Sequence, residues 1–235
     1  MRNSLKILLT GLAIIQFAGL TSRAATYQWD NNTVRYPLNA SDGTEPLDNW
    51  FANLFSVTAG ADLITSVSWG VFTTTPNSSA SVVLYRVTDP GGNPALGATR
   101  VYTQNFTPLT GDGTNAFLQT INLTTPVAFT VGDRMLVAIM IRNVIAAPPN
   151  DVYPFLLDTS DGTSYSWWDR AAPNSFNLDN LSNSRHTTQA FAPGGFAVDP
   201  GYIFIRANGI AVPEPSICAF GGLALAALAI LRRRK

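Results

Sequence analysis

Short runs of alternating apolar and polar residues recur along most of this chain, and such runs are typical of β-strands. Val67, Trp69 and Val71 alternate with serine and glycine, which places the apolar side chains on one face of an extended strand. Further runs rich in β-branched and aromatic residues are Ser81–Thr88, Val101–Phe106, Phe117–Leu123, Val152–Leu157, Tyr165–Asp169 and Tyr202–Ala207. No ten-residue stretch between positions 25 and 211 has a convincing helical period. The pattern predicts roughly eight to ten strands.

The segment Arg134–Arg142 is the most continuous apolar run in this part of the chain. Its uncharged interior lacks the alternation expected of a strand with one solvated face, so we predict a central strand buried on both faces. Turn formers separate the runs, and Asp89–Pro94 contains two prolines and two glycines that block both helix and ladder pairing. Residues 25–208 are therefore predicted to form an all-β domain, a single antiparallel β-sandwich with a jelly-roll-like arrangement.

Residues 1–24 have the three-part layout of a secretory signal peptide. A short basic region precedes the apolar run Ile7–Leu20, and the small residues Ser22 and Ala24 occupy positions −3 and −1 of a cut before Ala25. An N-terminal membrane anchor is the alternative, but the run is shorter than the roughly 20 residues that span a bilayer. We expect a signal helix that is read by the Sec translocon and removed by signal peptidase between Ala24 and Ala25.

The chain ends in a second composite signal. A short linker at 209–215 carries the motif formed by Val212, Pro213, Glu214 and Pro215. The uncharged run 216–231 follows, and the last four residues are Arg232, Arg233, Arg234 and Lys235. An apolar helix of this length reaches roughly 24 Å, a little short of a 30 Å hydrocarbon core. Terminal cations are held in the cytoplasm by the positive-inside rule, so we predict a short transmembrane helix with a basic cytoplasmic end at 232–235. A terminal core helix with a solvated basic end is the alternative.

The order Val-Pro-Glu-Pro, short apolar helix and arginine cluster resembles the PEP-CTERM sorting domain of bacterial exported proteins. The resemblance covers only Val212–Lys235 and says nothing about the body of the protein. It implies recognition by an exosortase, a membrane-embedded cysteine transpeptidase-like enzyme, and removal of the tail. It further implies an exported protein that is anchored in the inner membrane facing the periplasm before processing. The processed protein would then reach the cell surface or an extracellular matrix, in bacteria that make exopolysaccharide.

The body, residues 25–211, is acidic although the whole chain is formally neutral. It contains eight arginines and no lysine against fourteen carboxylates, a formal charge of −6. Nucleic-acid binding is disfavoured, because a phosphate backbone requires a basic face. The only cysteine, Cys218, lies in the terminal apolar run, so the body has no disulfide and no thiol chemistry. With a single histidine and no cysteine in the body, a zinc site is not expected, and we predict no cofactor.

Candidate catalytic residues are scarce. The body has no nucleophile-elbow, zinc-protease or phosphate-loop motif. His186 lies in the polar stretch Ser184–Thr188, which reads as a surface loop with an exposed histidine, although a Ser–His–Asp triad could still assemble in space. Most of the aspartates sit beside turn-forming residues, where a short carboxylate binds local backbone N–H groups. We predict that the body is not an enzyme. A glycoside hydrolase with two facing aspartates is a weaker alternative.

Two weaker ligand sites deserve testing. Asp158 and Asp161 form the best local cluster of hard oxygen ligands for calcium, but they lack the spacing of an EF-hand loop. Trp167 and Trp168 are adjacent, so a strand would turn one indole to the core and the other outward. An outward indole could stack on a sugar ring. The alternative is that both tryptophans are packing residues, one of them under a loop.

Residues Val57–Gly60 and Ile205–Ala207 resemble a first-strand turn and a last-strand ending in secreted jelly-roll modules of bacterial surface proteins. These motifs are short, and they support only the sandwich prediction. The leading functional hypothesis is an exported, non-enzymatic structural or adhesive protein that contacts exopolysaccharide. A carbohydrate-binding module is the principal alternative.

Overall fold

The structure is a computed structural model that describes residues 24–38, 46–72, 79–109, 115–144, 155–158, 165–187 and 202–212. The regular elements of these segments are all strands, which confirms the all-β prediction. They are β1 (Ala25–Tyr27), β2 (Val34–Leu38), β3 (Leu47–Ser56), β4 (Leu63–Val71), β5 (Ser79–Val87), β6 (Ala98–Phe106), β7 (Phe117–Ala128), β8 (Arg134–Val144), β9 (Phe155–Asp158), β10 (Ser166–Ala171), β11 (Arg185–His186) and β12 (Ile205–Ile210).

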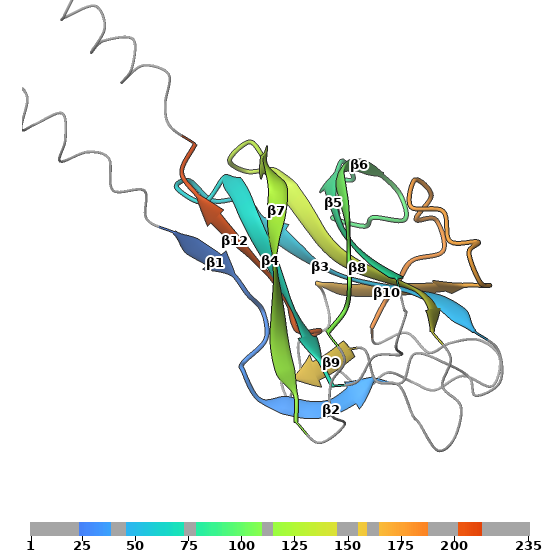
Figure 1. Ribbon diagram of the computed structural model, residues 1–235. Helices are drawn as coiled ribbons and strands as arrows, with labels where there is room; N and C mark the ends of the chain where they lie inside the picture. The colour runs from blue at the N-terminus through green and yellow to red at the C-terminus, as the bar shows by residue number, and fades with distance from the viewer. Residues whose placement is uncertain are drawn as a thin grey trace, which may run out of the picture.

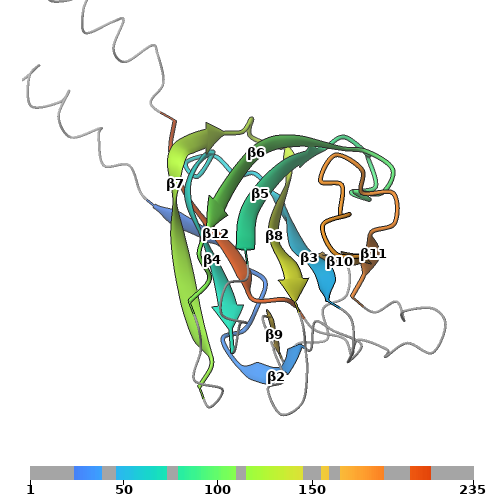
Figure 2. The ribbon, with the colours of Figure 1, turned by 45° about the vertical axis from the view of Figure 1, so that its right-hand side comes forward.

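Two large antiparallel sheets face each other, and a two-stranded ribbon lies at one end (Figures 1 and 2). The four-stranded sheet has the order β1-β12-β4-β7, and the six-stranded sheet has the order β11-β10-β3-β8-β5-β6. The ribbon pairs β2 with β9. Every pairing is antiparallel. This arrangement agrees with the predicted sandwich of two antiparallel sheets.

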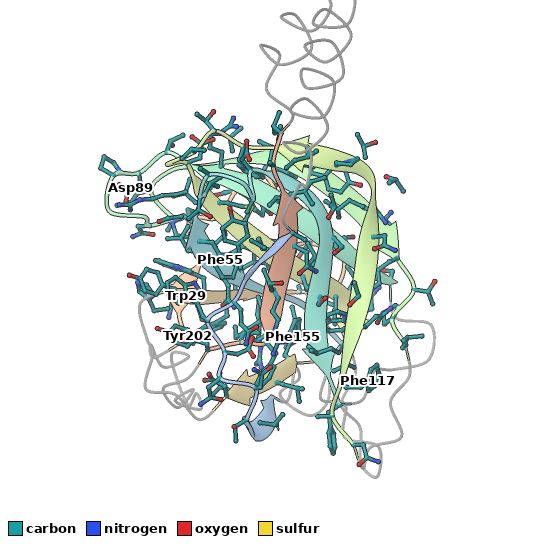
Figure 3. The ribbon with its side chains drawn as sticks, turned by 90° about the vertical axis from the view of Figure 1, so that its left-hand side faces the viewer. Trp29, Phe55, Asp89, Phe117, Phe155 and Tyr202 are labelled. Atoms are coloured by element: carbon teal, nitrogen blue, oxygen red, sulfur yellow. The ribbon has the colours of Figure 1, made fainter. Side chains whose placement is uncertain are left out.

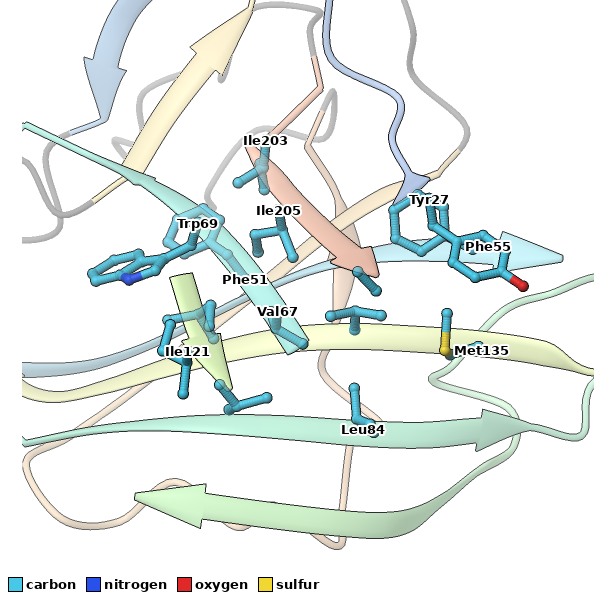
Figure 4. Packing of buried hydrophobic residues seen from close by; sticks show 14 of the residues in the cluster. Tyr27, Phe51, Phe55, Val67, Trp69, Leu84, Ile121, Met135, Ile203 and Ile205 are labelled. Atoms are coloured by element: carbon cyan, nitrogen blue, oxygen red, sulfur yellow. The ribbon is translucent and has the colours of Figure 1, made fainter. Parts of the chain in front are cut away.

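The main hydrophobic core lies between the two large sheets, as the close view of the packing shows (Figure 4). The four-stranded sheet contributes Ile64, Val67, Trp69, Ile121, Leu123, Ile205 and Ala207, and the six-stranded sheet contributes Phe51, Phe55, Leu84, Met135, Val137, Ile139 and Trp168. The predicted alternation of Val67, Trp69 and Val71 is confirmed, since all three are fully buried in this core. Burial of each such side chain contributes about 1.5–3 kcal/mol to folding.

Strand β8 is buried on both faces, as its sequence predicts. Met135, Val137, Ile139 and Ile141 point into the main core, and the residues between them belong to a second apolar cluster on the outer face of the six-stranded sheet. Phe176 and Leu181, from the segment between β10 and β11, cover that second cluster. The six-stranded sheet is therefore the middle layer of the molecule.

Strand β3 was not predicted, although it is one of the central strands. Its polar residues Asp48, Asn49 and Asn53 obscure the apolar pattern, yet all three are fully buried. The side-chain amide of Asn53 donates to the carbonyl oxygens of Ile203 and Ile205, at 2.7 and 3.0 Å. Buried polar groups are tolerated when they are hydrogen-bonded, so these asparagine bonds allow a polar residue to join the two sheets.

The two ends of the body lie side by side. Ala25 pairs with Gly209 across β1 and β12. Strand β12 continues to Ile210, so the predicted linker begins two residues later than position 209. A glycine reads as a linker residue in the sequence, but Gly209 and Ile210 pair with Ile64 and Leu63.

The signal segment 1–23, the tail from Pro213 and the calcium candidate Asp161 lie outside the described residues. Among the residues that are described, none belongs to a helix with the length and apolarity that a membrane span requires. The predicted signal helix and transmembrane helix therefore stay predictions.

Candidate functional site

Trp167 and Trp168 do not form an exposed sugar platform. Both lie on β10 with 3% and 4% of their surface exposed, one in each apolar cluster. The prediction that one indole faces outward is wrong because the outer face of the sheet carries its own core, and the segment between β10 and β11 covers it. Both tryptophans are packing residues, which is the alternative interpretation of the sequence.

His186 is not an exposed loop residue. It lies on the short strand β11, opposite Trp167, and is half-buried. Its ring packs on the indole of Trp167 with 3.7 Å between ring centroids. Burial lowers the pKa of His186 below the usual value for histidine, while a hydrogen bond with the backbone of Ser166 acts in the opposite direction. This environment favours the neutral imidazole at physiological pH.

The carboxylate of Asp158 binds the protein's own backbone. The side chain is completely buried, and its two oxygens accept hydrogen bonds from the N–H groups of Asn31 and Tyr202, at 3.0 and 2.7 Å. In the part of the chain that the structure describes, three or more metal-ligating side chains do not gather anywhere. Asp158 therefore serves to fix two neighbouring segments next to each other.

Asp30 and Asp48 have the same structural role. Asp30 binds the guanidinium of Arg206 through both carboxylate oxygens, and Asp48 accepts bonds from Arg142 Nη1 and from two backbone N–H groups. A glycosidase carboxylate must be able to reach a sugar. These buried aspartates have both oxygens engaged inside the protein, which weighs against using them in hydrolysis.

Asp169 is a different kind of buried carboxylate. Burial raises its pKa to about 6, although the N–H of Arg170 and the charge of Arg185 act to lower it. The raised pKa comes from desolvation, and no neighbouring carboxylate contributes to it. Paired catalytic carboxylates usually perturb each other, so the shift alone does not indicate a catalytic pair.

Some of the aromatic residues that reach the surface form a stack around Trp29 (Figure 3). The ring of Tyr165 lies parallel to the indole at a centroid distance of 4.4 Å, and the ring of Tyr202 lies at 5.8 Å. Tyr165 is 38% exposed, while Trp29 and Tyr202 are half-buried. We call Trp29, Tyr165 and Tyr202 the aromatic stack.

Contacts with the sandwich hold the aromatic stack in place. Trp29 Nε1 donates to the carbonyl oxygen of Leu54 at 2.7 Å, and the indole lies parallel to the core ring of Phe55. The Tyr165 carbonyl accepts from the N–H of Leu54 at 2.7 Å. Burial raises the pKa of Tyr202, and the nearby Tyr165 and Asp158 raise it further. The stack is therefore an ordered surface that exposes aromatic ring area, and the raised pKa keeps the Tyr202 hydroxyl protonated at physiological pH.

Sequence reasoning missed the aromatic stack because its members are far apart in the chain. Trp29 stands alone in a polar stretch, and Tyr202 begins the last apolar run. The adjacent Trp167 and Trp168 gave a stronger local signal. The rings come together because β12 pairs with β1, β10 pairs with β3, and the two sheets pack face to face.

No model of a known protein family matches this chain, and no curated protein matches it. Two solved structures are similar to it, with 11% sequence identity each. One is the Clostridial cysteine protease Cwp84 after propeptide cleavage, with a TM-score of 0.46 and coverage of 80% of this chain and 40% of that one. The other comprises the cysteine protease and lectin-like domains of Cwp84, a surface layer associated protein of Clostridium difficile, with a TM-score of 0.43 and coverage of 70% and 32%. This chain thus spans less than half the length of either, and similarity this distant assigns no activity.

Proposed function

We propose that this protein is exported, is held in the membrane by its C-terminal segment, and is then processed by an exosortase-like enzyme. The proposal is carried by the order of the terminal signals, namely a signal peptide before Ala25 and the Val-Pro-Glu-Pro, apolar and basic elements after Ala211. The pairing of Ala25 with Gly209 is compatible with it. Because both ends of the body leave from the same end of the sandwich, the opposite end faces away from a membrane that holds the tail.

The body left after processing is a non-enzymatic adhesive module. The buried aspartates Asp30, Asp48 and Asp158 bind arginines or backbone amides, which supports structural roles for them. The finer fold that we infer is a jelly roll. Its support is the strand order, in which the chain passes repeatedly from one large sheet to the other and β1 and β12 become neighbours.

The sorting proposal predicts that the tail decides where the protein resides. A tagged full-length chain should become shorter and leave the membrane in a host that has an exosortase, and it should stay intact in the membrane of a host that lacks one. A chain that ends at Ala211 should not be retained by either membrane. Replacing Pro213 and Pro215 by alanine should prevent shortening while retaining the apolar helix. Cell fractionation and immunoblotting measure all four. An intact, membrane-bound full-length chain in the exosortase host would contradict the processing proposal.

Polysaccharide binding is the second function, and the aromatic stack is the observation that favours it. Sugar rings present apolar C–H faces that pack against aromatic rings, and their hydroxyls bond to polar groups at the ring edges. Tyr165 offers exposed ring surface, and its position is fixed through the parallel stack on Trp29. The acidic body disfavours polyanionic partners, so we expect a neutral polysaccharide.

Removing the aromatic stack is predicted to weaken polysaccharide retention. Trp29→Ala and Tyr165→Ala should each lower the affinity for at least one neutral polysaccharide about tenfold, or ~1.4 kcal/mol. Affinity electrophoresis in gels that contain hydroxyethylcellulose, mannan or galactan measures the change. Tyr165→Ala is the cleaner variant because Trp29 also packs on Phe55. Leu96→Ala is the control, since Leu96 is 75% exposed in the loop between β5 and β6. Equal retention of all four proteins would exclude the stack as the binding surface.

A further inference from the structure

A groove of about 270 Å³ lies where the β2–β9 ribbon meets the four-stranded sheet. Phe117 and Phe204 are the aromatic residues that line it, and Val34 and Leu156 are aliphatic ones. Gly70 makes this packing possible, because a Cβ there would lie 2.6 Å from Phe204 Cβ and 2.7 Å from Leu156 Cδ1. Residues of β2, β7, β9 and β12 therefore line the groove, next to the place where β4 packs closely on β9.

The polar wall of the groove consists of Arg206 and Asn32. Arg206 uses Nε and Nη2 to bind Asp30, and Nη2 also donates to the side-chain oxygen of Asn32. Nη1 has no hydrogen-bond partner among the described residues. Asn32 is exposed and has a positive φ of 64°, a backbone conformation that few residues other than glycine and asparagine adopt.

The charge of this wall is already compensated. Asp30 neutralises Arg206, so the groove combines hydrogen-bond donors with no net positive charge. An anionic ligand gains little there, and the acidic body opposes it. A purely apolar ligand would bury the donors of Arg206 and Asn32 without partners, which is costly. A ligand with apolar faces and neutral hydroxyls can pack against the apolar residues of the groove and form hydrogen bonds with Arg206 and Asn32.

The groove and the point where the tail leaves lie at opposite ends of the four-stranded sheet. Leu63 pairs with Ile210 near the tail, whereas Val71 pairs with Phe117 at the groove. Leu63 and Val71 are eight positions apart along β4, which corresponds to roughly 25 Å. Figure 3 shows Phe117 at the end of the sandwich away from the end of β12. The groove is thus open to the outside while the tail is held in a membrane.

We propose that this groove binds one unit of a neutral polysaccharide, with a sugar ring against Phe117 and its hydroxyls on Arg206 and Asn32. This inference rests on the proposed polysaccharide binding and adds a second subsite to it. The segment 28–34 connects the two places, since Trp29 belongs to the aromatic stack and Asn32 and Val34 line the groove.

Isothermal titration calorimetry of the full-length chain in a sugar-free detergent tests this subsite. The probes are cellohexaose, mannohexaose and galactohexaose, with hexagalacturonate as the anionic comparison. Phe117→Ala removes the ring wall. Asn32→Gly removes the amide but keeps a residue that tolerates the positive φ. Asn174→Gly is the matched control, because Asn174 also has a positive φ, of 57°, and lies in the segment between β10 and β11.

At least one neutral hexasaccharide should bind, and its affinity should fall about tenfold in Phe117→Ala and severalfold in Asn32→Gly. Asn174→Gly should bind like the original chain, and hexagalacturonate should bind more weakly than the neutral probe. Binding that survives both groove variants but is lost in Tyr165→Ala would overturn the groove and leave the aromatic stack as the site. The absence of binding to every neutral hexasaccharide, or a preference for hexagalacturonate, would overturn the proposal as well.

Discussion

Replacing Asp48 by alanine is expected to lower the free energy of unfolding by about 3–5 kcal/mol. The Asp48 side chain is completely buried, and its carboxylate accepts hydrogen bonds from Arg142 Nη1 at 2.7 Å and from the N–H groups of Asn143 and Phe176 at 3.2 Å. Alanine would leave the Arg142 charge and two amides without their acceptor. It would also release Phe176, which covers the second apolar cluster. Urea denaturation followed by tryptophan fluorescence measures the loss.

The surface ion pair between Arg100 and Asp179 provides the matched control for Asp48. Its paired atoms are 2.8 Å apart, close to the 2.7 Å of the Asp48 pair, but the Asp179 side chain is 62% exposed. Asp179→Ala should therefore change the free energy of unfolding by less than about 1 kcal/mol. If Asp48→Ala and Asp179→Ala cost the same, burial does not set the strength of the Asp48 interactions and the prediction is wrong.

The part of the fold that could be predicted from the sequence is the part in which local pattern and burial agree. Strand β8 reads as an unbroken apolar run, and both of its faces are buried. Strand β3 could not be recognised, because Asp48 and Asn53 look like loop residues. Their partners, Arg142 and Ile203, are 94 and 150 residues away in the chain. The burial of these polar residues depends on hydrogen-bond partners that are distant in the chain, so a local sequence pattern cannot reveal it.

The candidate site shows the same limit. The sequence drew attention to Trp167 and Trp168 because they are neighbours, yet a second core covers the outer face of their strand. The aromatic stack is assembled from Trp29, Tyr165 and Tyr202, which are far apart in the chain and come together only in the folded protein. The proposed terminal signals are different in kind, because a translocon or a processing enzyme would read them as local sequence. They could therefore be proposed without any tertiary structure.

Replacing Arg206 by methionine is expected to destabilise the fold by about 3–5 kcal/mol and to weaken polysaccharide retention at the same time. The Asp30 side chain is completely buried, and Arg206 binds both of its oxygens. Methionine keeps much of the side-chain volume but leaves Asp30 as a buried charge without its partner. The segment 28–32, which carries Trp29 and Asn32, would then lose its anchor on β12.

The double variant Asp30→Asn/Arg206→Met separates the charge effect from the packing effect. It removes the unpaired carboxylate, so it should recover a large part of the stability that Arg206→Met loses. Arg206→Lys should lie between the original chain and Arg206→Met, because an ammonium group cannot reproduce the two-pronged contact of a guanidinium. Urea denaturation ranks the three variants, and affinity electrophoresis follows retention. The guanidinium carbon of Arg206 lies 5.7 Å from the centroid of the Phe204 ring. If the double variant is no more stable than Arg206→Met, Arg206 acts through packing over this ring, and its pairing with Asp30 contributes little.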